Sequence, residues 1–420
     1  MKNQWIIEQS DFDSVENIKR YESLFTLGNG YLGLRGDLIF SGKAIQKGTY
    51  INGFYEKGLI TYGEKAFGFA ENWQTMIPLP EGKEVNISIN GKKLFNNRGK
   101  FLENKRILDL KESKSVWEFI WKDESNLVYK GNVTTLVPFS FKGTAIFIWD
   151  LILPEDEQSI SFDSFLSFEN TGDSLSKDPR LPAHFNGSTI TLEKKVTNQD
   201  IKLLNILATG SSLTLSCTMD HLTGGIDIKE QRIDELENGY CTKLSGKAGR
   251  AIQFTKVLSY SYNSSKHIER TEKTVINEQK MVKINGIDKI LEEQRSFMEK
   301  YWQYGDIEIK GNKEAQISLR FNLFQMLQST GTDGKRTIAA KGLSGPGYEG
   351  HYFWDAETYV LPYFIYTNPS IARSMLEYRI SIVDGAKERA KLLGHDGVLF
   401  PWRTINGEES SAYFPAGTAQ

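Results

Sequence analysis

IDKILEEQRSFMEKYW, residues 287–302, is the segment at which the hydrophobic pattern of the chain changes from that of strands to that of helices. Its apolar residues recur every three or four positions, which places them on one face of a helix. KEAQISLRFNLFQMLQST, residues 313–330, repeats this spacing, and two more helical patterns follow within residues 369–394. Asn368 and Pro369 form a typical helix start at the head of that last range. We therefore expect helices from about residue 285 onward.

Residues from about 80 to 265 show the pattern of a sheet-rich region instead. EVNISINGKKL, residues 84–94, alternates apolar and polar side chains and then reaches Asn90-Gly91, which is a strong signal for a tight hairpin. Further short segments follow, rich in β-branched and aromatic residues and bounded by Gly, Asn, Pro or charge, with no helical pattern between them. This order favours a large antiparallel β-sandwich with no parallel sheet.

The composition excludes several classes of protein. The 51 Lys and Arg residues and the 53 Asp and Glu residues leave a net charge of −2, and no basic run is present, so we expect no nucleic-acid partner. The first 20 residues carry acids where a signal peptide is apolar, and no run reaches the roughly 18 apolar residues of a membrane helix. Two cysteines without a CxxC motif indicate a reducing compartment, and we expect a cytoplasmic protein.

GYEGHYFWDAETYVLPYFIYTNP, residues 347–369, crowds aromatic rings and carboxylates together where a helix is expected to begin. Asp355 and Glu357 follow directly on Trp354. A hydrophobic core needs rings but not acids, whereas a solvated surface needs acids but not rings. We expect the rings of Tyr359, Tyr363 and Phe364, which fall on the helix, to belong to the core.

GVLFPWRTINGEES, residues 397–410, is a second segment of this kind, with Trp402, Arg403, Glu408 and Glu409. Tryptophans beside carboxylates in loops suit a sugar, because the apolar face of a pyranose packs on an aromatic ring. Its hydroxyl groups need donors and acceptors in fixed positions. A helical scaffold that presents such loops at one end is the architecture of an (α/α)6 barrel.

Plainer interpretations of the same residues stay open. Asp355 could serve only as a helix N-cap and Trp354 only as packing. GNGYLG (residues 28–33) and GPGYEG (residues 345–350) match the dinucleotide-binding pattern but lack its strand–helix context, so tight turns explain their glycines better. His351 fits a hydrogen-bonded structural histidine, and the scattered His and Cys residues predict no metal site.

Three blocks of the chain resemble glycoside hydrolase family 65, the maltose, kojibiose and trehalose phosphorylase family. They are LFTLGNGYLGLRGD (residues 24–37), AAKGLSGPGYEGHYFWDAETYVLPYFIYTNPSIARSMLEYR (residues 339–379) and GVLFPWRTINGEES (residues 397–410). One departure is Ala356, which stands where the family motif usually has Thr. The resemblance implies an N-terminal β-sandwich domain over residues 1–270, a helical linker over 271–310 and the first part of an (α/α)6 catalytic barrel over 311–420.

The resemblance also implies inverting phosphorolysis of an α-linked disaccharide, with inorganic phosphate as co-substrate and no cofactor. Trp354 and Asp355 would bind the non-reducing glucose, and Trp402 and Glu408 would be further walls of that subsite. No catalytic residue is expected within the chain, because the general-acid Glu of the family would lie beyond Gln420. The complete protein is expected to form a homodimer.

On this interpretation the chain is an N-terminal portion, inactive by itself, with the apolar faces of residues 319–327 and 359–366 left without partners. Two other functions stay open. One is a related α-glucoside hydrolase, which would be distinguished by independence from phosphate. The other is a catalytically inactive carbohydrate-binding fragment.

Overall fold

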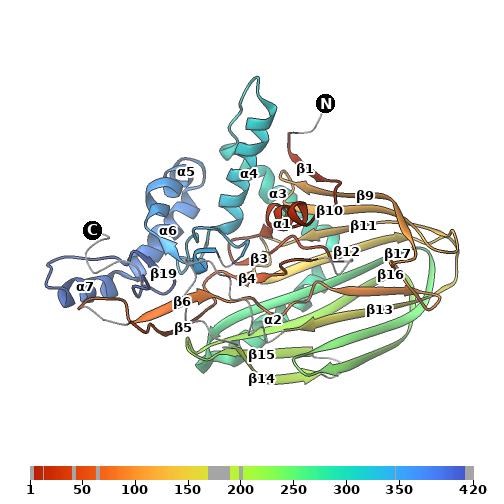
Figure 1. The fold of residues 1–420 in the computed structure, drawn as a ribbon, viewed down its shortest axis with the longest axis horizontal. Coiled ribbons are helices and arrows are strands. Elements are labelled where there is room, and N and C mark those ends of the chain that lie inside the picture. Colours follow the sequence, from red (N-terminus) through yellow and green to blue (C-terminus); the bar gives the residue numbers. More distant parts are fainter. Residues whose placement is uncertain are drawn as a thin grey trace.

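The computed structural model describes residues 4–12, 14–39, 44–62, 67–168, 190–197, 202–345 and 347–411. Figure 1 shows a broad, curved β region on one side and a group of helices, which includes the C-terminal ones, on the other. No helix among the described residues is both long and apolar enough to cross a membrane.

The main sheet has twelve strands, and its pairings are antiparallel throughout the described residues. They are β1 (Ile6–Gln9), β7 (Val85–Ile89), β8 (Lys92–Lys93), β9 (Lys100–Asp109), β10 (Lys114–Lys122), β11 (Val128–Leu136), β12 (Thr144–Ile152), β13 (Gln158–Ser167), β14 (Ile190–Thr197), β15 (Lys202–Ala208), β16 (Leu213–Leu236) and β17 (Gly239–Ser264). Small antiparallel sheets are formed by β2 (Leu27–Gly28), β3 (Leu32–Leu34) and β4 (Thr49–Ile51), by β5 (Tyr55–Leu59) and β6 (Asn72–Met76), and by β18 (Tyr352–Phe353) and β19 (Arg403–Thr404).

The long hairpin β16–β17 organises the main sheet. One edge of β17 pairs with β16, and the other pairs with β13 over residues 239–248 and with β12 over residues 251–259. Alternate side chains of β13 are buried, as expected for a sheet with one face against a core. Phe162 and Phe254 stack there with their ring centroids 4.1 Å apart. The predicted sheet-rich, sandwich-like N-terminal domain followed by helices is confirmed.

The predicted hairpin at Asn90-Gly91 is also confirmed. It joins β7 to β8, and both turn residues have the positive φ angles, 50° and 76°, that a two-residue hairpin turn requires.

The helices are α1 (Val15–Leu24), α2 (Ile268–Asn285), α3 (Ile287–Gly305), α4 (Lys313–Ser329), α5 (Leu361–Thr367), α6 (Pro369–Ser381) and α7 (Val383–Leu392). Helix α1, capped by Ser14, lies inside residues 1–270, for which a β-sandwich domain was expected. Helices after the sheet begin at Ile268 rather than near residue 285, because Thr271, Val275 and Val282 already place a buried stripe on α2 against the sheet.

Two predictions about buried faces were wrong. Leu323, Phe324 and Leu327 of α4 were expected to lack partners, but they are buried in the main hydrophobic core. Tyr359 was expected in the core, but it is 75% exposed. It lies in the π-helix η3 (Ala356–Val360), whose wider turn displaces it from the buried face that carries Phe364.

The GNGYLG segment forms the close contact between the β domain and the helices. The N–H groups of Gly28 and Gly30 donate to the side chain and the backbone oxygen of Gln328 at the end of α4. A Cβ at Gly30 would lie 2.1 Å from the Thr330 carbonyl oxygen, and a Cβ at Gly33 would lie 2.4 Å from Leu343. The glycines therefore permit backbone approach as well as the turn at Gly30, where φ is +81°.

Candidate sugar-binding site

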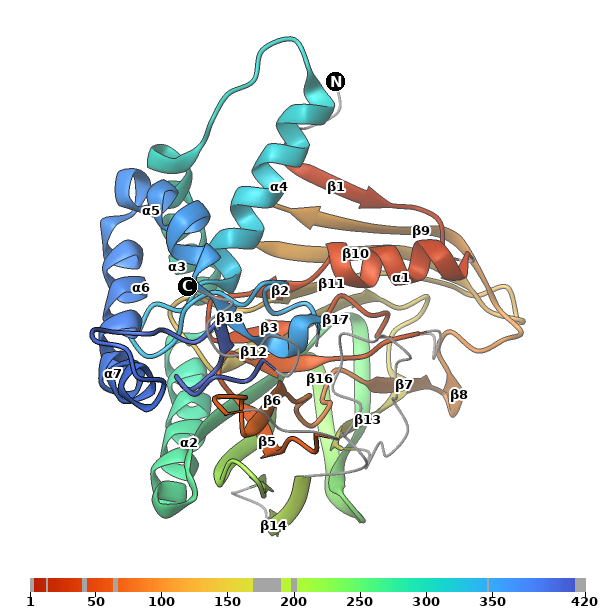
Figure 2. The ribbon, with the colours of Figure 1, turned by 60° about the vertical axis from the view of Figure 1, so that its left-hand side comes forward.

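Strands β18 and β19 bring together the two segments of rings and acids that the sequence singled out. Figure 2 labels the first of them, β18, close to where the helices meet the β domain. Phe353 lies opposite Arg403 in antiparallel register, so Trp354 and Trp402 are the next facing positions. Their ring centroids are 6.2 Å apart, with an interplanar angle of 68°. Trp354 is 44% exposed, which leaves part of this aromatic pair accessible to a ligand.

Asp355 follows this pair at the start of η3, and its carboxylate does not cap the helix. Its backbone is already helical, with φ −50° and ψ −31°, and its side chain makes no capping hydrogen bond. The side chain is exposed and forms no hydrogen bond or ion pair with any other residue that the structure describes. The geometry therefore does not support a role as N-cap alone, and the carboxylate is available to accept hydrogen bonds from hydroxyl groups.

The acids of the second segment have different partners. Glu408, the fourth predicted site residue, lies 3.3 Å from Nζ of Lys57 on β5, and its side chain is 47% exposed. Glu409 accepts a hydrogen bond from the backbone N–H of Trp402 at 2.6 Å. The structure thus joins Trp354, Asp355 and Trp402 in one place, and it directs Glu408 toward the β domain.

A buried polar cluster adjoins the aromatic pair in sequence, because Glu349 and His351 precede Trp354 and Arg403 follows Trp402. Arg403 Nη2 donates to Glu349 Oε2 at 2.9 Å, and Nδ1 of His351 lies 3.4 Å from the same oxygen. The Glu349 and His351 side chains are almost completely buried. Burial raises the pKa of Glu349 to about 7 although Arg403 opposes the shift. Burial and Arg403 hold the pKa of His351 well below its usual range, so this histidine is neutral.

The backbone that carries this cluster is strained. Tyr348 and Glu349 have φ angles of 52° and 58°, and Gly350 follows at 73°. Left-handed conformations at residues other than glycine cost on the order of 1–3 kcal/mol each, and they persist only where the surroundings hold them. His351, predicted to be structural, lies within hydrogen-bond distance of the Tyr348 carbonyl oxygen through Nδ1 at 3.1 Å. Pro346 of the same GPGYEG segment lies outside the described residues.

Buried residues of the β domain form hydrogen bonds with β18 and with the residues directly after β19. Gln74 of β6 is fully buried; its Oε1 accepts from the Ile405 N–H and its Nε2 donates to Asn406 Oδ1, both at 2.7 Å. The Tyr352 hydroxyl donates to Oδ1 of buried Asn52 at 2.6 Å. The predicted division into separate domains gave no indication of these contacts, because isolated Gln and Asn residues in a β region carry no sequence signal.

A second buried ion pair lies behind η3. Arg379 of α6 donates to Glu357 Oε2 at 2.9 Å, and this ion pair links η3 to α6. Glu357 is therefore engaged in packing the helices, in contrast to its exposed neighbour Asp355.

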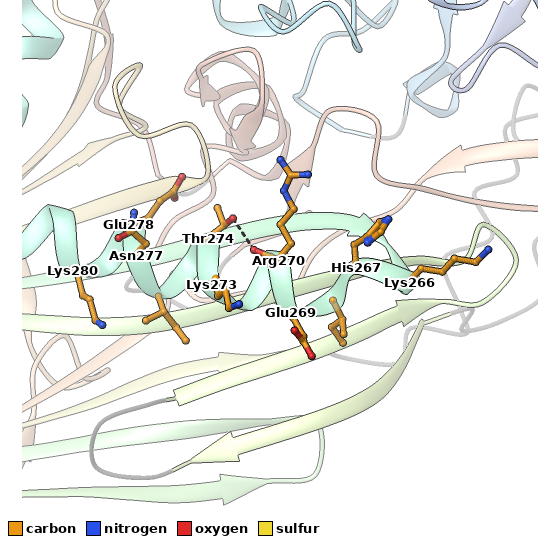
Figure 3. Close-up of a pocket in the computed structure, with 11 residues that line it drawn as sticks. Lys266, His267, Glu269, Arg270, Lys273, Thr274, Asn277, Glu278 and Lys280 are labelled. Atoms are coloured by element: carbon orange, nitrogen blue, oxygen red, sulfur yellow. Dashed lines mark hydrogen bonds between the residues drawn. The ribbon is translucent and has the colours of Figure 1, made fainter.

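An open concavity of about 1010 Å³ runs along α2 and the short helix η1 (Ser265–His267). Figure 3 shows its charged side chains, among them Lys266, Arg270 and Lys273, spread around the helix rather than converging on one point. None of the predicted sugar-site residues lines it, so it offers no alternative to the Trp354–Trp402 site.

Comparison with protein families gives two matches along the chain. Residues 7–301 match the N-terminal domain of glycosyl hydrolase family 65. Residues 320–419 match the central catalytic domain of the same family.

Curated relatives include two α,α-trehalose phosphorylases. That of Thermoanaerobacter brockii is 35% identical and that of Geobacillus stearothermophilus is 34% identical, each over 99% of this chain and 54% of its own length. A kojibiose phosphorylase of Thermoanaerobacter brockii is 29% identical over 97% of this chain and 52% of its own length. The chain thus spans about half the length of the curated relatives it matches.

Among solved structures, one described as a candidate kojibiose phosphorylase from the human microbiome superposes with a TM-score of 0.83. It is 24% identical and is matched over 98% of this chain and 53% of its own. At this identity the match supports the fold.

Proposed function

The chain belongs to glycosyl hydrolase family 65, and we propose that the protein is an inverting disaccharide phosphorylase that cleaves an α-glucoside with inorganic phosphate. The observation that carries the proposal is the Trp354–Trp402 pair with the adjacent unengaged carboxylate of Asp355, in a chain similar along nearly its whole length to trehalose phosphorylases. Because the chain spans about half of those relatives, the activity is proposed for the whole protein.

In this reaction a carboxylic acid protonates the glycosidic oxygen while phosphate attacks C1 of the glucose from the opposite face. The C1–oxygen bond breaks, a C1–phosphate bond forms, and β-glucose 1-phosphate leaves together with the second sugar. Phosphate takes the place of the activated water, and of the carboxylate that activates it, in an inverting hydrolase.

The site residues would hold the non-reducing glucose. The exposed ring of Trp354 would pack against an apolar sugar face, and Trp402, in edge contact with it, would set its angle. The carboxylate of Asp355 would accept hydrogen bonds from sugar hydroxyls, which are stronger when the acceptor is charged. Glu408, held beside Lys57, would form an outer wall of the subsite.

We also propose that α4–α7 belong to a helical catalytic barrel. Three large exposed side chains support this: Tyr359 on η3 is 75% exposed, Tyr366 on α5 is 87% exposed and Ile380 on α6 is 69% exposed. Further barrel helices that pack on α5 and α6 would cover them.

The direct test is an assay of the natural full-length protein with trehalose and with kojibiose, in the presence and absence of inorganic phosphate. Trehalose comes first because the trehalose phosphorylases are the more similar of the two groups of relatives. We expect β-glucose 1-phosphate to form only when phosphate is present. Release of free glucose alone, at a rate independent of phosphate, would instead identify a hydrolase.

A further inference from the structure

We propose that the Glu349–Arg403 ion pair is a positioning device: it holds the left-handed turn of GPGYEG in place and thereby sets Trp354 against Trp402. This inference rests on the proposed function for its effect on substrate, but its effect on the two rings can be measured independently of any activity.

The first argument is the placement of the two charges. Arg403 lies on β19 directly after Trp402, and Phe353, which pairs with it across the strands, directly precedes Trp354. Glu349 is three residues before Tyr352, at the entrance to β18. The hydrogen bond from Arg403 to Glu349 therefore links the turn before β18 to β19, and a tryptophan adjoins each of these two strands: Trp354 follows β18, and Trp402 precedes β19.

The second argument is the conformation of the turn. Tyr348, Glu349 and Gly350 follow one another with positive φ, and only the third is a glycine. Nothing in a short exposed loop would keep two consecutive non-glycine residues in this region. Here the Glu349 side chain is buried to 99% and is bonded to Arg403 from a strand more than fifty residues later in the chain.

The third argument is the shortness of the strand pairing. The two-residue strands β18 and β19 are paired only over Tyr352–Phe353 and Arg403–Thr404, which is too little to fix ring geometry alone. A Cβ added at Gly350 would lie 2.5 Å from Met76, so this part of the turn is packed closely against β6. The ion pair thus joins the side chain of the turn directly to the strand that bears the second ring.

The variants Glu349→Ala and Arg403→Met remove the two ends of the tether, whereas Glu349→Gln keeps an oxygen that accepts from Arg403. Asp306→Ala is the matched control, because Asp306 is bonded to another mostly buried arginine, Arg320, away from the two rings. It should lower stability without moving the tryptophans.

The structural readout is the far-ultraviolet exciton circular dichroism of the Trp354–Trp402 pair. It is taken as the difference between each protein and the same protein with Trp354→Phe, which cancels the contributions of Trp5–Trp302 and Trp117–Trp149. We expect Glu349→Ala and Arg403→Met to lose this difference signal, and Glu349→Gln and Asp306→Ala to keep it. A folded Glu349→Ala protein with the wild-type signal, or loss of the signal in Asp306→Ala, would overturn the proposal.

The functional readout is steady-state phosphorolysis by the natural full-length protein. The two disruptive variants are expected to raise KM for the disaccharide about tenfold, with a smaller change in kcat, and Glu349→Gln to restore KM. If one disruptive variant does not fold, the other is measured in the same way, and wild-type values for both readouts in it would overturn the proposal. If the unmodified protein cleaves no disaccharide, the proposed function fails, and the circular dichroism still decides the positioning role.

Discussion

Gln74 Oε1 accepts a hydrogen bond from the backbone N–H of Ile405 at 2.7 Å, and this bond links the β domain to the loop that carries part of the candidate site. The other end of the Gln74 side chain donates to Asn406. One fully buried amide of the β domain thus fixes two consecutive residues of the loop between Trp402 and Glu408.

Gln74→Met should lower the free energy of unfolding by about 1–3 kcal/mol, because it leaves the buried Ile405 N–H without an acceptor. Lys57→Met is the control, since this substitution removes only a partly exposed ion pair with Glu408, which contributes at most about 1 kcal/mol to stability. Denaturant titration of both variants measures the difference. Equal effects of the two substitutions would contradict a role for Gln74 in holding the loop.

Asp355→Ala should reduce kcat/KM of the natural full-length protein at least about tenfold, because a charged hydrogen bond to substrate is worth roughly 1.5–3 kcal/mol. Asp384→Ala removes another exposed acid, on α7, and should leave activity unchanged. Phosphorolysis of the best disaccharide substrate measures both. Wild-type kcat/KM in a folded Asp355→Ala protein would remove Asp355 from the proposed glucose site.

Gly30→Ala should destabilise the protein by more than about 2 kcal/mol, since its Cβ would meet the Thr330 carbonyl at 2.1 Å in a backbone with φ +81°. Gly385→Ala is the counterpart, because nothing lies within 4 Å of the added Cβ on α7. It should leave stability unchanged or raise it by up to about 1 kcal/mol. Thermal unfolding of the pair tests whether the glycine is required for the close contact with α4; tolerance of Gly30→Ala would show that it is not.

The stability of the protein should carry a pH dependence from Glu349. Its pKa in the folded protein, about 7, lies above the ordinary 4.5 of the unfolded chain, so its contribution is greatest below about pH 4.5 and is lost as the pH rises through 7. Relative to Glu349→Gln, which does not titrate, the wild type should therefore lose up to about 3 kcal/mol between acidic and weakly alkaline pH.

Arg403 and His351 face the Glu349 carboxylate. The pKa of His351 lies well below its ordinary value in the folded protein, so the contribution of His351 to stability runs in the opposite direction, but it is common to the wild type and Glu349→Gln and cancels between them. Glu388→Gln, at an exposed position on α7, is the control and should follow the wild-type curve. Unfolding free energies measured at several pH values decide the matter. Parallel curves for the wild type and Glu349→Gln would show that Glu349 ionises normally in the folded protein.

The local elements were largely predictable because they depend on neighbours in the sequence. The strands of β10, β12 and β13 and the helices α3, α4 and α6 follow from periodicity, and the Asn90-Gly91 hairpin follows from its two turn residues. Helix α1 was missed although Val15 and Ile18 lie at helical spacing, because a segment of only ten mostly polar residues gives a short signal. Tyr359 was misplaced because the π-helix shifts the phase of the helical face, and no residue pattern announces that shift.

The site residues were predictable only as two separate groups. Their types, tryptophan beside carboxylate, indicated sugar chemistry in each segment, and the family resemblance assigned the roles that remain predictions for Trp354, Asp355, Trp402 and Glu408. Glu349, Gln74 and Lys57 were not singled out, because each gains its role from a partner in a distant part of the chain.

The sequence by itself determined the antiparallel β region, the change to helices and the two segments that combine rings with acids, because these depend on side-chain period and composition over short windows. The tertiary structure decided that the two segments meet, that Trp354 lies 6.2 Å from Trp402, and that Glu349 in a left-handed turn is held by Arg403. It also decided that the β domain supports the site through Gln74 and Asn52. The physical reason is that such contacts join residues far apart in sequence, where packing and hydrogen-bond geometry rather than local preference select the partner.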